Sequence, residues 1–183
     1  MRFRSITLVL IAAIVSILPV AAQQSGTQTG LRKPDIYWVP TPPAVVDAML
    51  KLADVNSSDV VYDLGCGDGI IVTTAAQKYG ARAVGIDIDP QRVKEATERA
   101  RKMGVSDKVE IRQGDLFEAD IKDATVVTLY LLQSLNMKLM PKLKSDLKPG
   151  TRIVSQTFSM GEAWPPEKTI EVDGRQVFLW TVK

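Results

Sequence analysis

Two hydrophobic patterns alternate along the chain: short continuous apolar runs, and longer stretches with apolar residues three or four positions apart. The short runs are typical of strands inside a parallel sheet, because such strands are buried on both faces. The longer stretches have the spacing of helices that bury one face. The runs that we expect to form strands are residues 60–64, 83–88, 109–113, 125–132, 151–158, 169–172 and 177–182. The last two flank Asp173-Gly174, which predicts a tight hairpin turn.

Helices are expected between these strands, and two of them carry clear start signals. Thr41 is expected to cap the first helix, with Pro42 and Pro43 in its first turn. Asp89 is expected to cap the third helix, with Pro90 in its first position.

The stretch 135–147 has helical spacing but contains Pro141, so we expect a kink or two short helical pieces there. Taken together, the alternation of strands and helices predicts an α/β fold. The expected architecture is a Rossmann-like, doubly wound, mostly parallel sheet with helices on both faces and a C-terminal antiparallel hairpin.

The N-terminus has the features of a targeting segment. Arg2 and Arg4 precede an apolar run at 6–20, and small residues close the segment at 20–22. This pattern is typical of a secretory signal peptide at 1–22, with an uncleaved membrane anchor as the alternative. Either would place the rest of the chain outside the cytoplasm, in an exported or periplasmic location, and an uncleaved segment would keep it at the membrane.

Residues 23–34 are mostly polar and contain two glycines, which favours a flexible linker. The folded domain is therefore expected at 35–183, a length that suits one domain with an adequate core. No sustained heptad pattern is present, so the sequence is compatible with a monomer.

The composition excludes several kinds of catalytic site, metal site and partner. The chain has no histidine, which excludes Ser-His-Asp triads, Cys-His pairs and histidine metal ligands. Its single cysteine, Cys66, excludes internal disulfides and thiolate clusters, so no metal site is expected. The net charge of +2 gives no broad basic field, so no nucleic-acid partner is expected.

A glycine-rich loop, Asp63-Leu64-Gly65-Cys66-Gly67-Asp68-Gly69, joins the first expected strand to the second expected helix. A strand that turns through glycines into a helix forms the nucleotide-binding corner of doubly wound folds. The glycines allow a tight turn and a close approach of the backbone to a ligand. No Gly-Lys-Ser/Thr follows, which excludes a Walker loop.

Carboxylates at the ends of three expected strands distinguish between the nucleotide ligands that remain possible. Asp87 lies 22 residues after Gly65, where an acidic residue can accept hydrogen bonds from both ribose hydroxyls. Asp63 and Asp115 end neighbouring strands, so all three acids should meet at one edge of the sheet. They would repel the phosphates of a dinucleotide but suit S-adenosylmethionine (SAM), which carries a sulfonium and an ammonium.

These features resemble motifs of class I SAM-dependent methyltransferases: the loop 63–69, Asp87, and Gly114-Asp115-Leu116. More narrowly, the chain is similar to small protein-lysine methyltransferases, the broad-specificity archaeal enzyme and its mitochondrial relatives. The narrower likeness lies in Val39-Pro40-Thr41-Pro42, Val61 to Gly69, Ala124 to Leu129 and Leu147 to Ser155. The resemblance implies the sheet order 3-2-1-4-5-7-6.

The resemblance also implies a set of cofactor-binding residues. Asp63, Gly65 and Gly67 would contact the methionine end of SAM, and Gly69 would complete the same loop.

At the nucleoside end, Asp87 would hold the ribose hydroxyls and Ile88 would pack on the adenine. Asp115 and Leu116 would meet the adenine edge.

Tyr37 and Thr41, which precede the first expected helix, would close over the cofactor. Tyr130, at the end of the fourth expected strand, is our candidate for lining the channel through which the methyl group is transferred. A core aromatic is the alternative interpretation of Tyr130.

The leading functional hypothesis is therefore an enzyme that transfers methyl groups from SAM to lysine side chains of proteins. The segment 129–134 lacks the Asn-Pro-Pro-Tyr-like motif of nucleic-acid amino-methyltransferases, which argues against base methylation. A small-molecule methyltransferase is one alternative. A non-catalytic SAM-binding module is another, because an exported domain would seldom meet a cytoplasmic cofactor.

Overall fold

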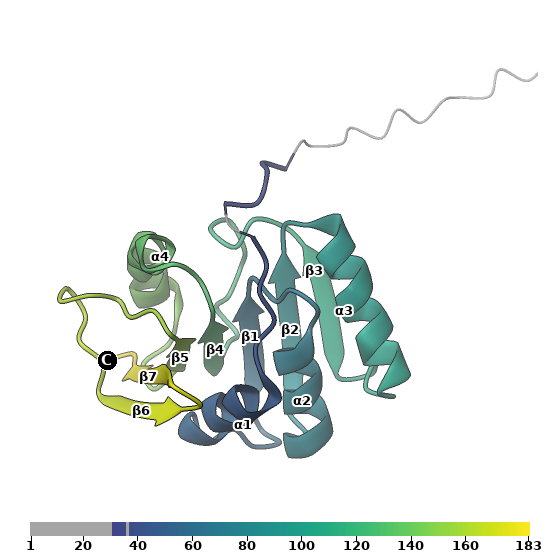
Figure 1. Ribbon diagram of the computed structural model, residues 1–183, viewed down its shortest axis with the longest axis horizontal. Helices are drawn as coiled ribbons and strands as arrows, with labels where there is room; N and C mark the ends of the chain where they lie inside the picture. Colours follow the sequence, from purple (N-terminus) through teal and green to yellow (C-terminus); the bar gives the residue numbers. More distant parts are fainter. Residues whose placement is uncertain (1–30, 36) are drawn as a thin grey trace, which may run out of the picture.

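The computed structural model describes residues 31–35 and 37–183. Within them the chain forms four helices and seven strands (Figure 1). The helices are α1 (Pro43–Leu52), α2 (Ile70–Tyr79), α3 (Pro90–Lys102) and α4 (Gln133–Asp146). The strands are β1 (Val60–Leu64), β2 (Arg82–Asp87), β3 (Val109–Gln113), β4 (Val126–Leu129), β5 (Arg152–Gln156), β6 (Lys168–Val172) and β7 (Arg175–Thr181).

The segment 1–22 that we interpret as a signal or anchor lies outside these described residues. In the part of the chain that the structure covers, no helix is long and apolar enough to cross a membrane.

All seven strands form one sheet with the order β3-β2-β1-β4-β5-β7-β6. Strands β1 to β5 pair in parallel, whereas β7 runs antiparallel to both β5 and β6. The predicted fold class and sheet order are confirmed. Every residue of β1 and β4 is buried, as the continuous apolar runs predicted for central strands.

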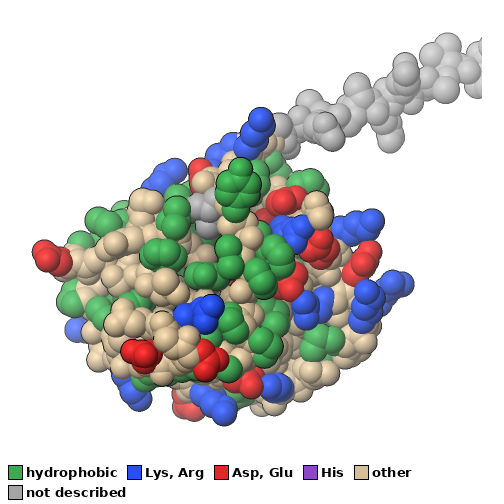
Figure 2. Space-filling model, in the orientation of Figure 1, with side chains coloured by type: hydrophobic (Ala, Val, Ile, Leu, Met, Phe, Trp, Pro, Cys, Tyr) green, Lys and Arg blue, Asp and Glu red, His purple; other side chains and the backbone are tan. Residues whose placement is uncertain are grey.

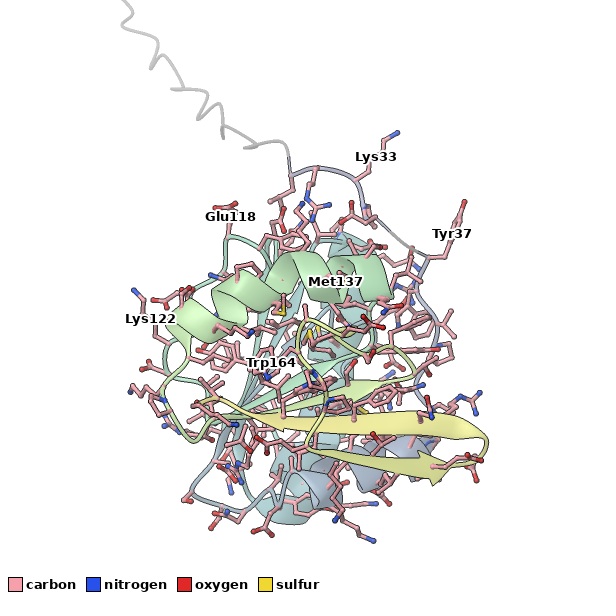
Figure 3. The ribbon with its side chains drawn as sticks, turned by 90° about the vertical axis from the view of Figure 1, so that its left-hand side faces the viewer. Lys33, Tyr37, Glu118, Lys122, Met137 and Trp164 are labelled. Atoms are coloured by element: carbon pink, nitrogen blue, oxygen red, sulfur yellow. The ribbon has the colours of Figure 1, made fainter. Side chains whose placement is uncertain are left out.

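Helices cover the two faces of the sheet unequally. Residues of α1, α2 and α3 share one hydrophobic cluster with one face, and α4 packs on the other face with Leu139 and Leu143 fully buried. Figure 3 shows the sheet near its β6 edge, with α4 above it and α1 below. The connections 114–125 and 157–167 contain no helix.

One predicted helix start is confirmed and the other is wrong. The Asp89 side chain accepts a hydrogen bond from the Gln91 backbone N–H at 2.8 Å, as expected of a cap. Thr41 does not cap α1. The cap position belongs to the extended Pro42, whose carbonyl accepts hydrogen bonds from the backbone N–H groups of Val45 and Val46. Two successive prolines delay the helix by one residue, because the residue before a proline avoids helical dihedrals.

Of the two alternatives expected at Pro141, a kink or two short helical pieces, the separate pieces are absent. Helix α4 runs unbroken from Gln133 to Asp146 with Pro141 inside it. Proline removes one backbone donor but leaves the rest of the helical hydrogen bonds in place. The buried Leu139 and Leu143 flank the proline and hold both halves of the helix on the sheet.

Candidate functional site

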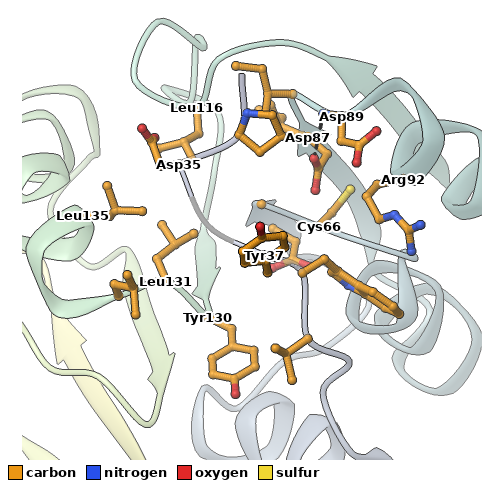
Figure 4. Close-up of a pocket in the computed structure, with 18 of the residues that line it drawn as sticks. Asp35, Tyr37, Cys66, Asp87, Asp89, Arg92, Leu116, Tyr130, Leu131 and Leu135 are labelled. Carbon is orange, nitrogen blue, oxygen red and sulfur yellow. Dashed lines mark hydrogen bonds between the residues drawn. The ribbon is translucent and has the colours of Figure 1, made fainter. Parts of the chain in front are cut away.

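A cavity of about 880 Å³ lies at the C-terminal ends of the parallel strands (Figure 4). Its volume is within the range of small-molecule sites, and its place is the usual binding crevice of doubly wound folds. Residues 31–35 and 37–41, here named the leading segment, run across this crevice and contribute to its wall. The predicted site residues that line the cavity are Tyr37, Thr41, Asp63, Gly65, Asp87, Ile88, Asp115, Leu116 and Tyr130.

Two predicted loop residues, Gly67 and Gly69, lie outside the cavity lining. Gly69 has a left-handed φ of 76°, and a Cβ there would be 2.8 Å from the Cβ of Ala96. It therefore allows α3 to pack closely against the start of α2. Gly67 is covered by an indole: a Cβ at this position would be 2.0 Å from Nε1 of Trp38.

Asp63 sits at the cavity floor near the end of β1 and is 3% exposed. Its Oδ1 accepts a hydrogen bond from the Thr128 hydroxyl of β4 at 2.7 Å. Burial raises the pKa of Asp63 to about 7, and the neighbouring carboxylates of Asp87 and Asp68 add to the rise. The loop thus contains an acid whose charge is poorly compensated and which a cationic ligand would stabilise.

Asp87 ends β2 and is anchored by the glycine loop. It accepts hydrogen bonds from the backbone N–H groups of Gly67 at 2.8 Å and of Asp89 at 3.0 Å. Burial raises the pKa of Asp87 despite these hydrogen bonds. The carboxylate is fixed in place beside the cavity, as the predicted ribose acceptor should be.

Cys66 packs inward, where a Cβ on Gly85 would be 2.8 Å from its sulfur. Burial raises the pKa of the Cys66 thiol well above its ordinary value, which disfavours the reactive thiolate.

Arg32 ties the leading segment to Asp115, a contact that sequence reasoning missed. Its guanidinium pairs with both carboxylate oxygens of Asp115, at 2.5 and 3.0 Å, and also with Asp35. This arginine holds the pKa of Asp115 below its usual value. Arg32 lies within the stretch interpreted as a linker, and no local pattern connects it to an aspartate 83 residues away.

A second tie, also missed, joins Trp38 to α3. The Arg92 guanidinium lies 4.5 Å from the centre of the Trp38 ring, and Arg92 also pairs with Glu95 at 2.6 Å. The indole has room at this position because Gly67 carries no side chain. The leading segment is therefore held at two points, one at Arg32 and the other at Trp38.

Tyr130 lies at the opposite end of the cavity from Asp87 and Asp89 (Figure 4). Its ring stacks on Phe158 with 6.5 Å between ring centres and an interplanar angle of 22°. The large apolar side chains most exposed in residues 31–35 and 37–183 are Leu31, Tyr37, Trp38, Val39, Leu132 and Met137. Five of these six belong to the leading segment or line the cavity mouth, and Figure 2 shows hydrophobic side chains gathered on this face.

Comparison with known proteins places this site in a family. The family described as "ANTKMT methyltransferase domain" matches residues 63–168. A protein-lysine N-methyltransferase of Saccharolobus islandicus is 47% identical over 154 residues, which cover 81% of this chain and 95% of that protein. The chain belongs to the ANTKMT methyltransferase family.

Solved structures agree with this membership. An RNA methyltransferase from Salinibacter ruber, bound to S-adenosyl-L-homocysteine, is 59% identical with a TM-score of 0.77, and the match covers 79% of this chain and 94% of that one. A SAM-dependent methyltransferase from Thiobacillus denitrificans, also bound to S-adenosyl-L-homocysteine, shares the fold at 23% identity and a TM-score of 0.58, over 64% of this chain and 49% of that one. The protein is a SAM-dependent methyltransferase, as predicted.

The residues of the methyltransferase cavity suit SAM. Six carboxylates and three cationic side chains line it: Asp35, Asp63, Asp68, Asp87, Asp89, Asp115, Arg32, Lys33 and Arg92. Two of the three cations, Arg32 and Arg92, are already paired with carboxylates. The excess of acids favours a ligand with a sulfonium and an ammonium over one with phosphates.

We predict that Gly67→Ala destabilises the methyltransferase more than Gly104→Ala. Both glycines have left-handed φ values, 52° and 69°, so both variants carry the backbone penalty of about 1–2 kcal/mol. Only Gly67 has a neighbour, Trp38, in the path of the new Cβ, which should add about 1–2 kcal/mol through lost packing. Urea unfolding measures both free energies. Equal losses in the two variants would contradict the placement of the indole. In a Trp38→Ala background, Gly67→Ala should cost about as much stability as Gly104→Ala.

We also predict that Asp63→Asn stabilises the ligand-free methyltransferase increasingly as pH rises. With a folded pKa of about 7 against an ordinary 3.8, native Asp63 binds more protons than the unfolded chain does between these values. The free energy of unfolding of the wild-type protein therefore falls across this window. The side-chain amide of the variant stays neutral, so its advantage should grow from pH 4 to pH 7 and level off at about 2–4 kcal/mol. Exposed Asp107→Asn is the control in pH-dependent urea unfolding; an Asp63→Asn advantage that is the same at pH 5 and pH 8 would refute the raised pKa.

Proposed function

We propose that this methyltransferase transfers the methyl group of SAM to lysine side chains of proteins. The observation that carries the proposal is the 47% identity to a protein-lysine N-methyltransferase over 95% of that relative's length. The shape of the site supports it. An acidic end that suits SAM is followed by an apolar and aromatic end that opens to the surface beside exposed hydrophobic residues.

For the methionine end of SAM, we propose contacts with Asp63 and with the backbone at Gly65, and we assign Gly67, which lies outside the cavity lining, to orienting Asp87. The supporting observations are that Asp63 and Gly65 line the cavity and that the Gly67 N–H orients Asp87. Gly69 we assign to packing against Ala96.

For the nucleoside end, we propose that Asp87 accepts hydrogen bonds from the ribose and that Ile88 packs on the adenine. Asp115 and Leu116 would meet the adenine edge, with Arg32 fixing the Asp115 carboxylate.

Tyr37 and Thr41 line the cavity from the leading segment. The Tyr37 side chain is 98% exposed and points away from the domain in Figure 3, so covering the cofactor would require it to turn inward.

The chemistry requires a neutral amine. A lysine with an ordinary pKa of about 10.4 must give up its proton at a cost of roughly 4.6 kcal/mol at pH 7. The end of the cavity that contains Tyr130 is lined by Leu131, Leu132 and Phe158, which would strip water from an entering ammonium. Such desolvation lowers the pKa of an amine. The bound cofactor supplies the electrophilic methyl group, and the residues of the chain align the amine with it and exclude water.

RNA is a second candidate acceptor, because the 59% identical Salinibacter ruber protein is described as an RNA methyltransferase. Charge argues against it. The chain has a net charge of only +2, and the cavity lining contains twice as many acids as bases. RNA binding depends strongly on cationic contacts with phosphates. We therefore favour a protein acceptor over RNA, and the 47% identity to a protein-lysine N-methyltransferase favours it over a small molecule.

Incubation with methyl-labelled SAM should distinguish these acceptors. We expect label in a mixed bacterial protein pool, on lysine after hydrolysis, and little label in parallel RNA and metabolite pools. Asp87→Ala should reduce labelling at least about tenfold through weaker SAM binding, whereas Asp107→Ala, an exposed acid remote from the cavity, should not. Label confined to RNA or to metabolites would overturn the proposal for protein lysines.

We further propose that residues 1–22 are an export signal and that the methyltransferase acts outside the cytoplasm. The basic residues, the apolar run and the small residues at 20–22 support this. N-terminal sequencing of the native protein should then begin at Gln23, in an extracytoplasmic fraction. An intact Met1 in the membrane fraction would support the anchor instead, and an intact Met1 in the cytoplasm would refute export.

A further inference from the structure

The turn that follows β5 holds an unfavourable backbone conformation. Thr157 is a β-branched residue with a left-handed φ of 67°, which such residues rarely adopt. The next residue, Phe158, donates its backbone N–H to the Gln156 carbonyl at 2.7 Å. Strained residues persist where surrounding contacts over-determine the backbone, and they gather at functional sites.

A buried amide on α4 provides those contacts. The Phe158 carbonyl accepts hydrogen bonds from the Ser155 hydroxyl at 2.7 Å and from Nδ2 of Asn136 at 2.9 Å. Asn136 is fully buried in the first turn of α4, and its Nδ2 also lies 3.2 Å from the Ser155 oxygen. The carbonyl of Phe158 can only accept, so the amide nitrogen must be the atom that faces it.

The carbonyl oxygen of the same amide lies in an environment that lowers stability. Oδ1 of Asn136 is buried and has no hydrogen-bond partner within the described residues. An unpaired buried carbonyl lowers stability, and an apolar side chain of similar shape would avoid this loss. Stability alone therefore does not account for an asparagine at position 136.

The consequence of this arrangement lies in the cavity. The ring of the tethered Phe158 stacks on the ring of Tyr130. Tyr130 lies between the end of β4 and the start of α4. Both rings line the cavity, and Tyr130 lies at the end opposite Asp87 and Asp89 (Figure 4). An aromatic wall offers the methylene chain of an amine an apolar surface, and it offers no carboxylate that would hold the amine in its charged form.

We infer that Asn136 is a positioning residue for the methyl acceptor. It holds the Phe158 backbone so that the Phe158 and Tyr130 rings form one wall, and an aliphatic amine reaches the cofactor along that wall. That the acceptor is an amine rests on the proposed function. The wall would position any acceptor that the enzyme uses.

Asn136→Leu tests this role, because it keeps the number and branching of the side-chain heavy atoms, removes the unpaired oxygen and deletes the Asn136 hydrogen bond to the Phe158 carbonyl. We expect kcat/KM to fall at least about tenfold for a lysine peptide that the wild-type enzyme methylates. The affinity for SAM should stay within about twofold of wild type. The urea midpoint should stay close to that of wild type, since one unfavourable group is lost with one hydrogen-bond donor. The matched control is Thr151→Val, which also removes a buried side-chain hydrogen bond to a backbone carbonyl, that of Ala124, but lies outside the cavity lining and should leave kcat/KM unchanged.

Phe158→Leu should reproduce the loss, and the Asn136→Leu/Phe158→Leu double variant should lose little more than either single variant. An unchanged kcat/KM in Asn136→Leu would overturn the inference. So would additive losses, or a parallel fall in stability and SAM affinity, which would make Asn136 merely structural. If the wild-type protein labels RNA and no lysine, the proposed function fails, and the same variants assayed on that RNA still decide the role of Asn136.

Discussion

The structure depends on how closely other elements approach the turn between β1 and α2. A Cβ on Gly69 would be 2.8 Å from Ala96 of α3, and a Cβ on Gly67 would run into the Trp38 indole. At Gly65 the Leu131 side chain, just after β4, would be 3.1 Å away. One short stretch of bare backbone therefore sets the positions of the leading segment, α3 and the chain that follows β4. These are three walls of the cavity, so a side chain at any one of the three glycines would displace the wall that packs against it.

The electrostatics of the cavity follow from this compactness. The turn buries Asp63 and fixes Asp87 with the Gly67 N–H, and burial raises the pKa of both carboxyls. Asp115 differs because Arg32 compensates its charge. Of the three acids predicted at strand ends, the two near the turn are thus poorly compensated, and the third, just after β3, is neutralised. A ligand whose positive charge lies at one end and whose neutral nucleoside lies at the other matches this distribution, which is the charge arrangement of SAM.

Most of the fold and half of the site could be predicted from the sequence, because the relevant signals are local. Continuous apolar runs predicted the strands, and the glycine loop with the carboxylates at strand ends predicted residues that the structure brings together around one cavity. The ties made by Trp38 and Arg32 could not be predicted, since each joins residues far apart in sequence through a contact that only the folded chain creates. Gly69 shows the reverse problem: a loop glycine expected beside the ligand lies outside the cavity lining and close to Ala96 of α3. The sheet order itself came from the resemblance to methyltransferases, and hydrophobic patterns alone would not have distinguished it from other parallel orders.

The unequal covering of the sheet has a consequence for the acceptor. Three helices pack on one face, but the connections 114–125 and 157–167 contain no helix, and both reach the cavity through Leu116 and Phe158. The cavity mouth is therefore bounded by loops without helices and by the exposed apolar residues Trp38, Val39 and Leu132. A small molecule would enter such an open site without excluding the remaining water. A protein that covers these apolar residues while it inserts one lysine would complete the enclosure itself, since burying apolar surface favours docking and removes water from the amine. The open mouth is thus better suited to a macromolecular acceptor than to a metabolite.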